Sequence, residues 1–251
     1  QKTITTTNTP FIFYEAPELL GRLDINAGIR FAQVKREFTN YNTTGLPYMP
    51  EDDIFDHPNL TKDPRLSYSK TYRKVLFNFG VGYKLTDHIY PYFAFSQNFR
   101  VPPNFIGTIP NNVDAQFVIN QLKPEESVNY DLGVRFDFDK LYVVPAIYYT
   151  DYKNRLIRIA DPNDPNLVYL RNAGKVKAYG FELEVGAKPF KDLSLYGSYS
   201  YNVAEFKDDC TTLSTGNPVC GISGNQVPDT PKHMFKLGID YRIFGFNIRP
   251  S

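Results

Sequence analysis

The chain has 251 residues and a formal net charge of +1 at pH 7, so its charge balance gives no support to binding of nucleic-acid phosphates, which requires clustered Lys and Arg. It contains 19 Tyr and 20 Phe but only 2 Met, a composition that favours strands and turns over helices. No stretch approaches the roughly 18 consecutive apolar residues of a transmembrane helix, whereas a membrane β-barrel stays possible because only alternate residues of its strands face lipid.

Apolar and polar side chains alternate along most of the chain. In the segment 171–189, Tyr179, Phe181 and Leu183 share an apolar row, while Glu182 and Glu184 belong to a small or acidic row. The same period of two recurs in segments 23–31, 73–85, 88–100, 126–138, 141–152, 193–203 and 234–242, and a shorter segment starts at 246. This period is typical of strands with one polar face. The sequence therefore predicts eight strands and a partial ninth.

The connections between the predicted strands alternate in length. Long connections lie near 39–71, 100–125, 153–168 and 205–232, and each is followed by a turn of a few residues. Because consecutive antiparallel strands reverse direction, all long connections leave one end of the sheet and all short turns leave the other. Outer-membrane barrels have this asymmetry, with short periplasmic turns and long extracellular loops. The pattern predicts an all-β fold, a transmembrane antiparallel β-barrel.

Several segments, in order, resemble the barrel of the TonB-dependent receptors, which are outer-membrane importers of Gram-negative bacteria. The matching stretches are "LDINAGIRF", "YPYFAFSQNFRVPPNF", "LKPEESVNYDLGVRFDF", "AIYYTDYKNRLI", "NAGKVKAYGFELEVGAKP" and "VPDTPKHMFKLGIDYR", and together they cover most of residues 20 to 242. They include a strand that ends in Phe-Arg-x-Pro and strand starts with Leu-x-Pro-Glu and Pro-Lys-His. Asp131 stands where the family more often has Glu.

The resemblance implies a bacterial outer-membrane location and a larger protein. Plugged transporters of this kind have about 22 strands, so residues 1–251 are expected to be a portion of one barrel domain. The globular plug, and the segment that engages a TonB-type energy-transducing partner, are not in this chain. The other partners implied are outer-membrane lipid, lipopolysaccharide and a small-molecule metal chelate.

Two groups of residues are candidate binding surfaces. The polar rows carry both signs of charge and are expected to face the lumen, where they would line water in a porin or contact the plug in a receptor: Arg30, Lys74, Asp131, Arg135, Glu182, Glu184 and Lys236. At the outer end, aromatic contact area and a cation could form a mouth for an anionic ferric chelate: Tyr41, Tyr48, Phe99, Arg100, Asn104 and Phe105. An aromatic girdle with ordinary loop packing would use the same residue types.

Other chemistry has weak support. Cys210 and Cys220 lie in the last long connection, where an exported loop can hold a disulfide, with two free thiols as the alternative. No His near them completes a metal-ligand set, so no metal site is expected. His57, His88 and His233 are scattered and join no recognisable Ser or Cys nucleophile motif, so no catalysis is expected. The chain is expected to need no cofactor, with iron present only as part of a transported chelate.

The sequence thus predicts part of a TonB-dependent receptor that binds and imports a scarce nutrient, which in this family is most often a ferric siderophore. Two alternatives stay open. A passive porin would use the same strands without a plug, and a small barrel acting as an adhesin would need this chain to be complete.

Overall fold

The computed structural model describes residues 1–42, 61–104, 115–160, 168–172, 174–208, 211–212, 218–219, 223–243 and 246–248. The strands are β1 Lys2–Asn8, β2 Phe11–Leu19, β3 Leu23–Asn42, β4 Thr61–Tyr83, β5 Ile89–Arg100, β6 Glu125–Phe138, β7 Leu141–Lys153, β8 Leu156–Ala160, β9 Val168–Asn172, β10 Val176–Phe190, β11 Leu193–Phe206, β12 Thr211–Thr212, β13 Pro218–Val219, β14 His233–Ile243 and β15 Phe246–Ile248. A helix, α2, covers Ala115–Gln121. No helix in these ranges is long and apolar enough to cross a membrane.

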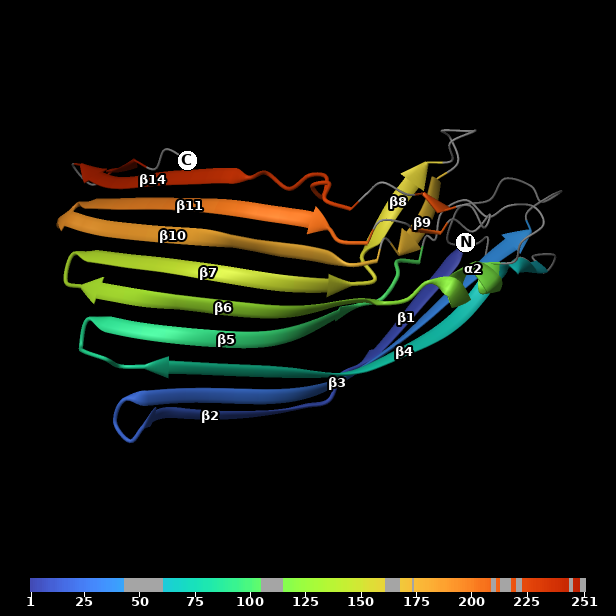
Figure 1. Ribbon diagram of the computed structural model, residues 1–251, viewed down its shortest axis with the longest axis horizontal. Coiled ribbons are helices and arrows are strands. Elements are labelled where there is room, and N and C mark those ends of the chain that lie inside the picture. Colours follow the sequence, from blue (N-terminus) through green and yellow to red (C-terminus); the bar gives the residue numbers. More distant parts are fainter. Residues whose placement is uncertain are drawn as a thin grey trace.

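One 11-stranded antiparallel sheet forms the body of the molecule. Its order is β1-β3-β4-β5-β6-β7-β10-β11-β14-β15, with β2 paired to β3. Figure 1 shows the short turns at one end of this sheet, and at the other, here called the outer end, it shows α2, the β8–β9 hairpin and the far ends of β3 and β4. The predicted strands and the sorting of turns by length are therefore present. All nine predicted strands are found, as β3 to β7, β10, β11, β14 and β15.

Strands β1 and β2 were not predicted from the sequence. They pair with successive parts of β3, from Lys2 opposite Thr39 to Leu19 opposite Leu23, so they form one edge strand in two pieces. The break falls at Pro10, which has no N–H to donate, although its carbonyl still accepts a hydrogen bond of 3.0 Å from the Phe31 N–H. The stretch after Pro10 is apolar on both faces, which hides the period of two.

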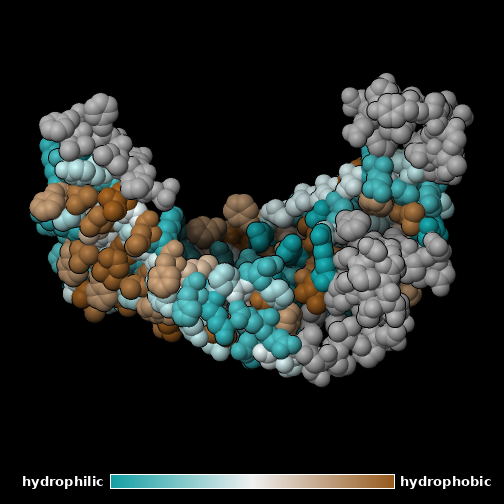
Figure 2. Space-filling view, turned by 90° about the horizontal axis from the view of Figure 1, so that it is seen from above, coloured by the Kyte–Doolittle hydropathy of each residue, from teal (hydrophilic) through white to brown (hydrophobic). Residues whose placement is uncertain are grey.

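The two faces of the sheet differ in chemistry. One carries exposed apolar side chains along neighbouring strands, including Phe77, Leu132, Ile147 and Leu237. The other carries the polar and small residues. Figure 2 shows hydrophobic side chains gathered toward the short-turn end of the molecule and hydrophilic ones over the middle, where the surface is hollowed. This is the distribution that a barrel wall needs where its strands cross the hydrocarbon layer.

The outer ends of the strands extend well beyond a membrane span. Strand β3 has 20 residues and β4 has 23, whereas about 9–11 suffice to cross the membrane. Both strands therefore continue into the segment 39–71 that was predicted to be a loop. Helix α2 and strand β8 lie within the predicted loops 100–125 and 153–168, whereas β9 starts at the end of the second of these and runs to Asn172. The reason is that side chains beyond the membrane no longer face lipid, so the alternation that marks a strand fades there.

A small hydrophobic core holds the outer end together. Tyr68 of β4, Leu170 of β9 and Ile119 of α2 are buried in it, and Phe38 of β3 and Leu156 of β8 pack against it. Lys70 of β4 fixes the end of the helix, because its ammonium donates to the carbonyl oxygens of Ile119 at 2.7 Å and Leu122 at 3.0 Å, where a helix leaves carbonyls without partners. Parts of three long connections thus form one packed unit.

Candidate functional site

The register of the strands places all seven residues predicted for the lumen on the polar face. Arg30 lies opposite Leu76, Lys74 opposite Ala32, Arg135 opposite Tyr90, and Lys236 opposite Ser198. Asp131 lies opposite Ala94 and Tyr148, Glu182 opposite Ala146 and Ser200, and Glu184 opposite Val144 and Ser198. This face is concave, because Tyr90, Arg135, Tyr142 and Glu184 from four different strands line one cavity of about 800 Å³ near the short turns.

The middle of the concave face is acidic. Asp131 on β6 and Glu182 and Glu184 on β10 lie close enough to act electrostatically on the Tyr92 side chain. Glu184 accepts a hydrogen bond of 2.9 Å from the Tyr142 hydroxyl. In the described part of the chain, neither Asp131 nor Glu182 has a hydrogen-bond or ion-pair partner. These two carboxylates are therefore available to a cationic group that enters the concavity.

Tyrosine side chains on this face lie across glycines of the neighbouring strand. Tyr90 of β5 covers Gly82 of β4, and its hydroxyl donates to Asp24 of β3 at 2.5 Å. Tyr148 of β7 covers Gly180 of β10 in the same manner. A Cβ atom at Gly82 would collide with the Tyr90 ring, and one at Gly180 would collide with the backbone carbonyl oxygen of Tyr201 as well as with the Tyr148 ring. The glycines of the polar rows thus allow aromatic rings to lie flat along the wall and to link strands that are not adjacent.

At the outer end, the structure brings together three of the predicted mouth residues. Phe99 and Arg100 end β5, and the chain then turns across the concave face to Asn104. Phe99 and Arg100 line a cavity of about 340 Å³ together with Arg36 of β3. Tyr41 lies farther along β3, opposite Lys62, and does not line this cavity. Tyr48 and Phe105 lie outside the described residues.

Two residues that contact Asn104 were not found by the sequence analysis. Arg36 Nη1 donates to the Asn104 side-chain oxygen at 3.3 Å, and the Tyr68 hydroxyl donates to the Asn104 carbonyl oxygen at 2.6 Å. Burial of Tyr68 raises the pKa of its phenol to about 12, against an opposing effect of the Arg36 charge. One feature of the sequence could have indicated Arg36. The alternation of Arg30 and Ala32 continues through Val34, past the predicted strand end at residue 31, so a longer strand would have placed Arg36 on the same face.

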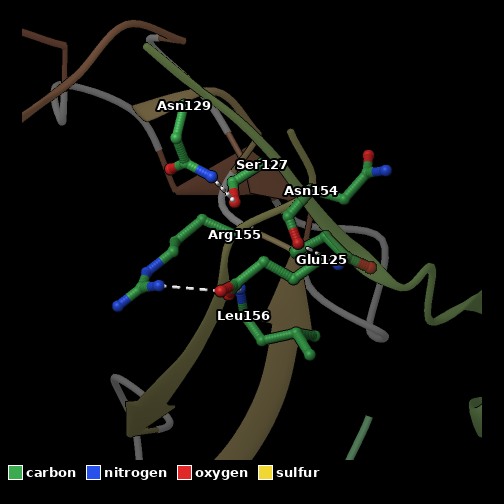
Figure 3. A network of polar contacts seen from close by, with 7 residues as sticks. Glu125, Ser127, Asn129, Asn154, Arg155 and Leu156 are labelled. Carbon is green, nitrogen blue, oxygen red and sulfur yellow. Dashed lines mark hydrogen bonds and ion pairs between the residues drawn. The ribbon is translucent and has the colours of Figure 1, made fainter. Parts of the chain in front are cut away.

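A second polar network holds the β8–β9 hairpin to the start of β6 (Figure 3). Glu125, whose side chain is only 7% exposed, accepts a hydrogen bond from Arg155 Nη1 at 2.8 Å and one from the Leu156 backbone N–H at 3.1 Å. Asn172 donates to the Asn154 carbonyl oxygen at 2.7 Å and to the Lys123 carbonyl oxygen at 2.9 Å. The Leu-x-Pro-Glu motif thus ends in the carboxylate that anchors this hairpin.

The remaining predicted sites have little structural counterpart. Cys210 and Cys220 lie outside the described residues. Within the described ranges there is no group of three or more His, Cys, Asp or Glu side chains placed to hold a metal ion. His57 also lies outside the described residues. The His88 Nδ1 atom is 2.8 Å from the Asp137 carbonyl oxygen, and that of His233 is 3.0 Å from the Tyr199 hydroxyl.

Comparison with known proteins matches residues 5–249 to the family described as TonB dependent receptor-like, beta-barrel. The chain is 26% identical over 194 residues to the ferrichrome outer membrane transporter/phage receptor of Escherichia coli. This match covers 76% of this chain and 23% of that protein. It is 27% identical over 204 residues to the ferrioxamine receptor of Yersinia enterocolitica, covering 80% of this chain and 24% of that protein. The chain thus spans about a quarter of the length of these two relatives.

Solved structures share the fold at low sequence identity. The siderophore receptor PiuA from Acinetobacter baumannii superposes with a TM-score of 0.69 at 19% identity, over 96% of this chain and 32% of that one. The ferric yersiniabactin uptake receptor FyuA from Yersinia pestis superposes with a TM-score of 0.64 at 23% identity, over 96% of this chain and 32% of that one. The copper transporter OprC superposes with a TM-score of 0.68 at 14% identity, over 96% of this chain and 34% of that one.

Proposed function

Because the chain belongs to the TonB-dependent receptor β-barrel family, we propose that it forms part of the wall and mouth of a receptor that binds a ferric siderophore at the cell surface and imports it. The protein is a bacterial outer-membrane protein, and its family consists of receptors and transporters. The observation that carries the proposal is the pairing of an exposed apolar face with a concave polar face along strands β3 to β7, β10, β11 and β14, all of which lie within the residues that match the family.

The proposed cargo rests on relatives at low identity. The ferrichrome transporter and the ferrioxamine receptor are both named for iron chelates, which supports a siderophore. The copper transporter OprC has the same fold, so the fold alone does not select the metal. Iron enters this proposal as cargo within a chelate, and the protein has no resident cofactor and breaks no bond of its ligand.

The acidic middle of the wall suggests how the lumen is closed. A plug domain that fills the barrel would meet Asp131 and Glu182, and cationic side chains on the plug would pair with these carboxylates. Removing such charges from water is costly unless they are paired, so the contact favours a seated plug. A TonB-type partner would have to pull against these pairs to open a path.

The test is uptake of radioactive iron by cells that carry the full-length protein and lack their other siderophore receptors. The proposal expects uptake of at least one ferric hydroxamate, catecholate or carboxylate chelate, and loss of that uptake when the energy-transducing partner is deleted. Uptake that persists without the partner would contradict the proposal and indicate a passive porin. A steady open current from the full-length protein in a planar bilayer would indicate the same, whereas a plugged receptor stays nearly silent until denaturant unfolds the plug.

A further inference from the structure

Two phenylalanine side chains of β2 depart from the polar character of the concave face. Phe11 is opposite Arg30 and Phe13 is opposite Gly28 on β3. Directly opposite residues of an antiparallel pair share a face, so both rings belong to the row of Arg30. Phe11 is 72% exposed and Phe13 is 50% exposed. Strand β2 therefore presents apolar surface to the lumen as well as to lipid.

The two rings line a cavity of about 340 Å³ on the concave face. Leu76 and Asn78 of β4 also line it, and the Asn78 side chain lies over Gly28, where there is no side chain to fill the space beside Phe13. The volume is at the lower end of the roughly 300–1,000 Å³ of small-molecule sites. The cavity therefore accommodates a small apolar group and not a whole metal chelate.

The tyrosines of the concave face differ from this pair in having a polar end. The hydroxyl groups of Tyr90, Tyr142 and Tyr148 donate hydrogen bonds to polar side chains of other strands. Phe11 and Phe13 have no such group, and an aromatic ring carries about 150–250 Å² of surface that gains from leaving water. Exposed apolar surface of this kind beside polar surroundings marks a contact site.

The surface that covers this pair has to be present for most of the time. The chain spans about a quarter of the length of two of its relatives, and in the proposed receptor a plug fills the lumen. A ligand crosses the lumen only during import, whereas a seated plug would cover Phe11 and Phe13 throughout the resting state. A resident apolar partner therefore fits the pair better than a transient one.

We propose that Phe11 and Phe13 form a docking site for an apolar side chain of the plug, and that this site fixes the rotation of the plug within the barrel. Asp131 and Glu182 lie on β6 and β10, and strands β3, β4 and β5 separate β2 from β6 (Figure 1). The wall thus offers an apolar contact and an acidic contact at different positions around the lumen. A plug with one apolar and one cationic surface satisfies both in a single orientation. The inference rests on the proposed function and assigns the chemistry of this contact.

Photo-crosslinking of the full-length receptor in outer membranes tests the contact. Phe13→p-benzoylphenylalanine keeps an aromatic ring at the position, and mass spectrometry identifies the peptide to which it links. We expect a link to an apolar residue of the plug. Ile12→p-benzoylphenylalanine is the matched control, because Ile12 is equally exposed but lies opposite Ile29 on the lipid face, so it should link to no plug peptide. A link from position 13 to another barrel strand, or to no peptide, would overturn the proposal.

Two double variants measure whether the contact is apolar. Phe11→Gln with Phe13→Gln should increase the fraction of receptor molecules that conduct in a planar bilayer at moderate urea by about tenfold or more, since covering even one such ring is worth that factor. Phe11→Leu with Phe13→Leu keeps apolar surface and should conduct like wild type. Both rings are at least half exposed in the wall, so these changes remove little packing within it.

Equal conduction by wild type and the Gln variant would contradict the proposal, and so would an equal gain in the Leu variant. Iron uptake by wild type that depends on the energy-transducing partner would in such a case leave the proposed function intact. Absence of all partner-dependent uptake would remove that function instead.

Discussion

Tyr90 and Gly82 show how single residues build the concave wall. The Tyr90 ring starts on β5, crosses β4 over Gly82, and reaches the Asp24 carboxylate on β3. Three strands are thus linked by one side chain, and only a residue without a Cβ atom leaves room for it. Tyrosine rings lie in the same way over Gly133 and Gly186, whereas asparagine side chains lie over Gly28 and Gly80, so the glycines of the polar rows make room for polar side chains that lie along the wall.

We expect Gly82→Val to displace Tyr90 and to destabilise the barrel by about 1–3 kcal/mol, the usual cost of forcing extra atoms into a packed site. Tyr90→Phe should have a smaller effect, because it removes the hydroxyl and leaves the ring in place. The measurement is the denaturant concentration at which half of the full-length protein in detergent is unfolded. The folded fraction is read from the mobility of unheated samples on gels.

Gly197 provides the control for this prediction. A Cβ atom there would have its nearest neighbour, the Leu237 side chain, at an ordinary 3.6 Å. Gly197→Ala should therefore change stability by less than about 0.5 kcal/mol. Equal losses from Gly82→Val and Gly197→Ala would show that glycine flexibility, and not the space for Tyr90, is what matters.

At the scale of elements, the strands that cross the membrane could be predicted, except for β2, which pairs with the membrane-crossing part of β3 but is apolar on both faces, and the strand segments beyond the membrane could not. Lipid on one face and polar surroundings on the other impose a strict period of two, which is visible in β3, β6 and β10. The outer half of β4 packs against protein on its concave face, where Tyr68 and Tyr72 are buried, so its alternation follows local contacts. Helix α2 has 7 residues, fewer than the roughly 11–18 over which a helical period can be recognised.

The β8–β9 hairpin is held in place by a carboxylate that belongs to another element. Glu125→Gln should remove the charge from its bonds to Arg155 and to the Leu156 N–H, at a cost of about 1.5–3 kcal/mol. This corresponds to a roughly 10- to 100-fold faster amide exchange in β8 and β9, since about 1.4 kcal/mol is a factor of ten. Hydrogen exchange with mass spectrometry on the full-length protein measures it directly.

Glu126→Gln is the matched control for the hairpin. Glu126 is the next residue, but its carboxylate pairs with Lys74 at 2.7 Å, and among the described residues it makes no hydrogen bond or ion pair with β8 or β9. Its loss should leave exchange in the hairpin unchanged. Faster exchange in both variants would mean that the overall negative charge of β6, and not the contacts of Glu125, holds the hairpin. Unchanged exchange in Glu125→Gln would mean that Glu125 does not anchor the hairpin.

For the whole molecule, the sequence was sufficient for the fold and for the rows of the wall but not for the outer site. Asp131, Glu182 and Glu184 could be assigned to one face because a strand fixes side-chain direction along its length. Arg36 meets Asn104 only because the chain after β5 turns back across the sheet, a contact between residues 68 positions apart. No local pattern encodes such a meeting, whereas Phe99 and Arg100 could be placed at the outer end from the sequence because they end a recognisable strand.

The unpaired carboxylates at the middle of the wall lead to a prediction about the complete receptor. If Asp131 and Glu182 pair with cationic groups of a seated plug, the double variant Asp131→Asn, Glu182→Gln leaves those cations buried without partners, at about 3–5 kcal/mol for each broken pair. Current through a planar bilayer should then appear at a lower urea concentration than in wild type. The control is Glu37→Gln with Glu205→Gln, which neutralises two carboxylates that each pair with a lysine two residues away instead of facing the lumen. An identical onset of current in wild type and in the Asp131, Glu182 variant would mean that the plug is held by other contacts, while an early onset confined to that variant would identify these two carboxylates as its latch.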